Sequence, residues 1–60
     1  MKSLIETLME RDEISREEAT RQVEDAAQDM LDDDLSPEEI LESYFGLEPD
    51  WVLDLLEYAL

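Results

Sequence analysis

Carboxylates are the side chains of this 60-residue chain that could do chemistry. Nineteen Asp and Glu residues stand against four Lys and Arg residues, for a net charge of −15 at pH 7, and there is no Cys or His. The chain therefore lacks the thiolate nucleophile, the commonest general base and the commonest transition-metal ligand. Paired carboxylates catalyse acid–base reactions only in a pocket that shifts their pKa values, for which so short a chain has little room. We predict that the protein is not an enzyme, with no catalytic residue and no cofactor.

The run Asp32-Asp33-Asp34 is the stretch that comes nearest to a calcium-binding loop. An EF-hand loop needs a Gly at its sixth position and a Glu at its twelfth. Counted from Asp32, these positions hold Pro37 and Ser43. We therefore expect diffuse attraction of cations and no specific metal site.

Four segments carry apolar residues at helical spacing, and none alternates with the period of a strand. This pattern predicts an all-α fold: a compact bundle of four short helices near residues 2–11, 16–32, 37–45 and 49–59, in one domain spanning residues 1–60. The four stripes are Met1, Leu4, Ile5, Leu8 and Met9; Ala19, Val23, Ala26, Ala27, Met30 and Leu31; Ile40, Leu41, Tyr44 and Phe45; and Trp51, Val52, Leu55, Leu56 and Ala59. A domain of this size buries only about 60% of its unfolded surface. We expect dimerisation to complete the bundle.

Local signals mark where these helices begin and end. Ser15 with Glu18, and Ser36 with Glu39, have the spacing of capping boxes, in which serine and glutamate each satisfy a free backbone N–H. The only glycine, Gly46, is expected to end the third helix in a left-handed conformation.

The acidic residues of the second and third helices define an acidic partner face. Carboxylates three or four residues apart on a helix stand about 5–6 Å from one another, which resembles the charge density of a nucleic-acid backbone. The face comprises Glu18, Asp25, Asp29, Asp32, Asp33, Asp34, Glu38, Glu39 and Glu42. Such charge repels nucleic acids and anionic membranes, so we expect neither as a partner. We expect a basic protein instead.

The predicted function is a non-catalytic protein–protein interaction or regulatory role in which this face engages the basic partner. In its most specific form the protein would imitate nucleic acid, as small acidic phage proteins that imitate DNA do. Two alternatives stay open. The protein could be an accessory module that docks through its apolar C-terminal helix, or a halophilic protein whose acidity only maintains solubility.

The fourth segment is apolar around most of its circumference. Trp51 and Tyr58 fall on one flank of its core stripe, and Leu53 and Leu60 fall on the other. Three other short helices can hardly cover both flanks, and large exposed apolar surfaces mark interfaces. We therefore predict a homodimer through a self-association face of Trp51, Leu53, Leu56, Tyr58 and Leu60, with a different partner or a monomer as alternatives. Tyr44, Phe45, Leu47, Val52, Leu55 and Leu56 are expected in the core.

No apolar run approaches the roughly 18 residues that span a bilayer. Glu6 and Glu10 interrupt the first apolar segment, which argues against a signal peptide. Together with the lack of Cys, this predicts a protein that is not attached to a membrane and lies in the cytoplasm.

Overall fold

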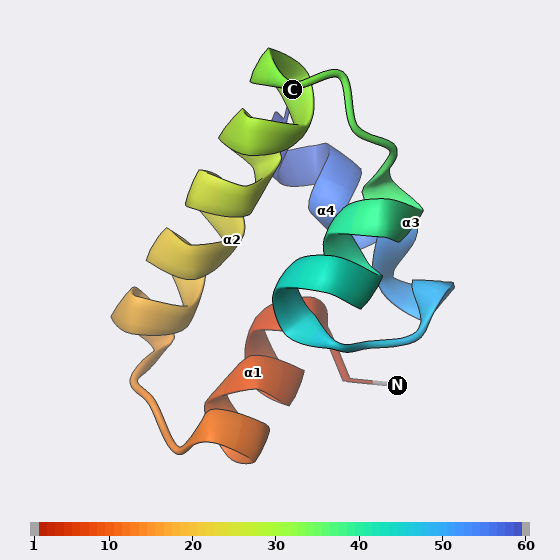
Figure 1. Ribbon diagram of the computed structural model, residues 1–60. Helices are drawn as coiled ribbons and strands as arrows, with labels where there is room; N and C mark the ends of the chain where they lie inside the picture. Colours follow the sequence, from red (N-terminus) through yellow and green to blue (C-terminus); the bar gives the residue numbers. More distant parts are fainter. Residues whose placement is uncertain (1, 60) are drawn as a thin grey trace.

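The computed structural model describes residues 2–59, which form helices and short connections without a strand (Figure 1). The elements are α1 (Leu4–Asp12), α2 (Arg16–Asp32), α3 (Pro37–Ile40), the π-helical turn η1 (Leu41–Phe45), the 3-10 turn η2 (Pro49–Trp51) and α4 (Val52–Ala59). The predicted third helix is α3 continued by η1, and the predicted fourth helix is η2 continued by α4. The all-α class and the four-helix bundle are thus confirmed. No helix within residues 2–59 has both the length and the apolar character needed to cross a bilayer.

Helix α2 is the element against which the others pack. Figure 1 shows α2 along one side of the molecule, with α1 at its first end and α3 and α4 facing its second half. Contacts of α2 with α1, α3 and α4 agree with this arrangement. The longest helix therefore organises a bundle of 29 × 20 × 18 Å.

The core is built from the predicted stripes. Its buried side chains are Leu4, Ile5, Leu8, Ala19, Val23, Ala26, Ala27, Met30, Ile40, Leu41, Phe45 and Leu55. Leu47, Val52 and Leu56 are half-buried and pack against this core. No polar or charged side chain within residues 2–59 is buried. The fold is therefore stabilised by apolar burial, each buried aliphatic side chain contributing about 1.5–3 kcal/mol.

Two predicted core residues lie at the surface. Leu31 is 57% exposed, although the residue before it, Met30, is buried. Tyr44 is 46% exposed. The π-helical turn buries Leu41 and Phe45, and Tyr44 between them in the sequence lies at the surface.

Serine side chains cap three helix starts. Ser15 Oγ accepts from the Glu18 N–H at 3.1 Å, and Ser36 Oγ accepts from the Glu39 N–H at 3.2 Å. Neither glutamate returns a bond to the serine N–H, so the prediction of complete capping boxes there was wrong. The Glu18 carboxylate instead pairs with Arg21 of the next turn.

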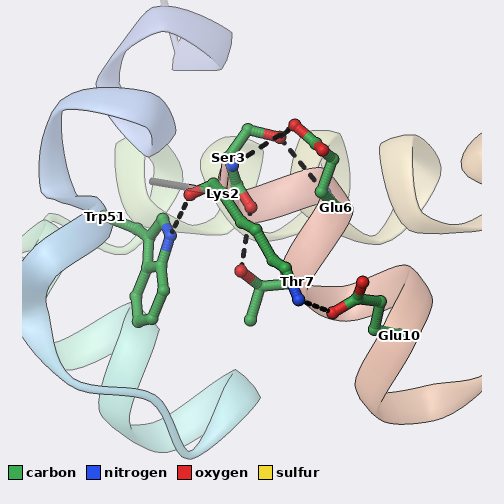
Figure 2. A network of polar contacts seen from close by, with 6 residues as sticks. All are labelled: Lys2, Ser3, Glu6, Thr7, Glu10 and Trp51. Atoms are coloured by element: carbon green, nitrogen blue, oxygen red, sulfur yellow. Dashed lines mark hydrogen bonds and ion pairs between the residues drawn. The ribbon is translucent and has the colours of Figure 1, made fainter.

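A complete capping box occurs at the start of α1, where none was predicted. The Glu6 N–H donates to Ser3 Oγ at 3.2 Å, and the Ser3 N–H donates to Glu6 Oε1 at 3.5 Å. Figure 2 shows this pair beside the Thr7 hydroxyl, which donates to the Ser3 carbonyl at 2.9 Å. The Ser-x-x-Glu signal is present in the sequence, so it could have been found there.

In the described chain, η1 and α1 end on a residue in the left-handed conformation, and after α2 such a residue follows the cap Asp33, which has φ of −100°. Gly46 has φ of 65°, as predicted, and its N–H donates to the carbonyls of Leu41 and Glu42. The other two residues have side chains: Glu13 has φ of 53° and Asp34 has φ of 55°. An L-residue pays a steric cost in this conformation that glycine does not.

Candidate interaction surfaces

The carboxylates of this protein lie at its surface, and few of them meet a cation. All except Glu18, Asp29 and Asp54, which are half-buried, are exposed. Residues 2–59 contain three ion pairs among themselves: Lys2 with Glu10, Arg11 with Asp12, and Arg21 with Glu18. The other carboxylates have no cationic partner within the described chain, so they surround the molecule with a negative potential.

The acidic partner face is divided between α2, the turn after it and the third helix. Asp25, Asp32, Asp33, Asp34, Glu38, Glu39 and Glu42 are exposed. Asp32 accepts from the Gln28 amide at 3.1 Å. Glu18 stands apart, because it is paired with Arg21 and lies three turns, or roughly 16 Å, before Asp29.

Tyr44 joins the two helices of this face. Its hydroxyl donates to Asp29 Oδ2 at 3.0 Å, across from η1 to α2. This hydrogen bond, partial desolvation and the charges of Asp29 and Asp33 all raise the pKa of Tyr44 above its ordinary value of 10.0. Asp29 and the half-exposed ring of Tyr44 therefore lie together within the acidic partner face. Tyr44 was predicted in the core, and its contact with Asp29 was not predicted.

The predicted self-association face is also divided. Leu53 is 76% exposed and Tyr58 is 40% exposed, whereas Trp51 and Leu56 are half-buried against the core. Leu60, the fifth predicted member, lies outside the described residues. The homodimer itself stays a prediction, because the structure describes a single chain.

One flank of α4 is used within the chain, by the start of α1. The Trp51 indole N–H donates to the Lys2 carbonyl at 3.1 Å (Figure 2). Tyr58, on the same flank, lines a shallow pocket of about 120 Å³ with Ser3 and Leu4. Part of the apolar surplus predicted for this helix is therefore satisfied inside the fold.

Helix α1 is held at both ends by side-chain contacts that sequence reasoning did not identify. Asp54 Oδ2 of α4 accepts from the Leu4 N–H at 2.9 Å, which satisfies a free donor of the first turn. At the other end, the Arg11 guanidinium donates to the Phe45 carbonyl at the end of η1. Arg11 also pairs with Asp12, and this hydrogen bond lowers the pKa of the Asp12 carboxyl. The spacing of residues along the sequence gives no indication of hydrogen-bond partners 34 or 50 residues away.

Within residues 2–59, no three Asp or Glu side chains gather in a geometry that could hold a metal ion. Three features therefore stand out for function: the acidic partner face, the Tyr44 contact within it and the exposed Leu53. No protein-family model, curated protein or solved structure matches this chain, so the roles of these features have to be argued from their own chemistry.

Proposed function

We propose that this protein is a non-catalytic interaction protein whose acidic partner face engages a basic protein. The observation that carries the proposal is the hydrogen bond from the Tyr44 hydroxyl to Asp29, which connects the carboxylates of α2 to the third helix. Charge of one sign concentrated on a rigid surface accelerates association with a partner of opposite charge and selects against the wrong partners.

The chemistry of this face suits Arg and Lys side chains in particular. Unpaired carboxylates accept charge-assisted hydrogen bonds from guanidinium and ammonium groups. The half-exposed ring of Tyr44 can also form a cation–π interaction with one of these side chains, which contributes about 0.5–1 kcal/mol at exposed sites. A basic groove that normally holds a nucleic acid presents such side chains in a row. The protein would compete with nucleic acid for that groove, in the cytoplasm.

The test compares two triple variants that remove the same charge. The first changes Asp32→Asn, Asp33→Asn and Asp34→Asn within the acidic partner face. The control neutralises three exposed carboxylates outside it, with Glu17→Gln, Glu24→Gln and Glu48→Gln. Each protein is immobilised and tested for capture of purified basic nucleic-acid-binding proteins, with and without competing duplex DNA.

We expect the wild-type protein and the control variant to retain a partner that moderate salt or duplex DNA displaces, and the face variant to lose it. Equal loss in both variants would mean that total charge, and not this face, produces the binding. A halophilic origin gives a third result, in which no partner is retained and helicity is low in dilute buffer and restored in molar salt.

A further inference from the structure

Leu53 is the most exposed large apolar side chain described in this structure, at 76%. Two exposed carboxylates, Asp50 and Glu57, lie three residues before it and four residues after it. Residues at these spacings are neighbours on a helix surface. Half-buried Leu56 lies three residues beyond Leu53 and links it to the core. We call these four residues the leucine flank.

Within residues 2–59 neither Asp50 nor Glu57 forms an ion pair, although Glu57 also lines the pocket of about 120 Å³ beside Ser3, Leu4 and Arg16. Trp51 and Asp54 bind the Lys2 carbonyl and the Leu4 N–H, so the segment that begins α1 lies against these two residues. It also borders the pocket that Glu57 lines, but Leu53 is not among the residues that line this pocket. Asp54 is also four residues from Asp50 and three from Glu57, but its carboxylate is used by α1. The leucine flank is therefore an apolar ridge bordered by two carboxylates without a cationic partner among residues 2–59.

We propose that the leucine flank binds an amphipathic helix of another protein, one that presents an aliphatic ridge bordered by Lys or Arg. Apolar residues at helical spacing form the usual helix-to-helix contact, and basic borders match Asp50 and Glu57 in charge. A second copy of this chain fits the flank less well. It would bring together two molecules of −15 each, and the flank contains no basic residue to offset its own carboxylates. The leucine flank lies on a different helix from the acidic partner face. Either proposal can therefore fail without affecting the other.

The probe is a synthetic peptide of about four helical turns, composed of Leu and Lys with every Leu on one face. An isomer of identical composition, with its Leu residues distributed around the helix, controls for attraction by charge alone. Affinity for each labelled peptide is measured by fluorescence anisotropy at two salt concentrations. We expect the amphipathic peptide to bind about tenfold more tightly than its isomer, the factor that corresponds to burying much of one leucine side chain.

Two variants locate the binding site. Leu53→Asn is expected to remove the preference for the amphipathic peptide, whereas Leu31→Asn, at an exposed leucine on α2, should leave it unchanged. Neither side chain belongs to the core, so both variants should retain the helicity of the wild-type protein. The pair Asp50→Asn and Glu57→Gln should weaken binding at low salt more than at high salt.

Equal affinity for the two peptides would overturn the proposal, as would an unchanged preference in Leu53→Asn. Sedimentation equilibrium tests whether a second copy of this chain occupies the flank instead. A wild-type dimer that Leu53→Asn dissociates, together with equal affinity for the two peptides, would assign the flank to that second copy. The triple variant of Asp32, Asp33 and Asp34 should leave the preference intact, which separates this result from the test of the acidic partner face.

Discussion

Replacing Asp54 with alanine is expected to destabilise the fold by about 1–2 kcal/mol, although this residue belongs neither to the core nor to an ion pair. Its carboxylate accepts from the Leu4 N–H at 2.9 Å and so fastens α1 to α4. A hydrogen bond to a charged group contributes roughly 1.5–3 kcal/mol. Alanine has a higher helix propensity than aspartate, which offsets up to about 0.7 kcal/mol of this loss. The remainder is a large fraction of the roughly 3–9 kcal/mol expected for a chain of this size.

The measurement is urea unfolding followed by circular dichroism and by the fluorescence of Trp51, whose indole contacts Lys2 beside the broken bond. Thermal unfolding should show a decrease in Tm of about 4–8 °C for each kcal/mol lost. Glu57→Ala is the matched control, because it removes one negative charge from an exposed position on the same helix. That variant is expected to be neutral or slightly stabilising. If the two variants unfold at the same urea concentration, the Asp54 contact contributes nothing and the reasoning fails.

Three further perturbations test other contacts. Glu13→Gly should stabilise the protein by about 1 kcal/mol in urea unfolding, because glycine adopts the observed φ of 53° without the steric cost of a side chain, whereas Glu13→Gln should not. Gly46→Ala should cost about 1–2 kcal/mol through φ of 65° alone, since nothing lies within 4 Å of the added Cβ; an unchanged midpoint would contradict this. Because its folded pKa is raised, the contribution of Tyr44 to stability is complete below the unfolded value near 10 and is lost as pH rises through the folded value. Ultraviolet titration should show Asp29→Ala lowering the pKa of Tyr44, and an unchanged value would exclude their hydrogen bond as its cause.

The helices themselves could be predicted from the sequence, because their determinants are local. Apolar spacing places each helix, and serine at positions 15 and 36 satisfies backbone donors within its own first turn. Gly46 ends η1 because only glycine adopts a left-handed conformation without a steric penalty. Each of these interactions joins residues at most a few positions apart, so the spacing of residue types suffices to find it.

The surfaces depended on which helices become neighbours, and local spacing does not contain that information. Trp51 and Leu53 are both large apolar residues of one helix, yet Trp51 contacts the Lys2 segment and Leu53 faces solvent. Likewise, Asp54 resembles its neighbours Asp50 and Glu57 in the sequence, and only the approach of α1 turns its carboxylate into a helix cap. Composition and period therefore determined an acidic bundle of four helices. The packing of Lys2 and Leu4 against Trp51 and Asp54 decided which side chains of the fourth helix remain available to a partner.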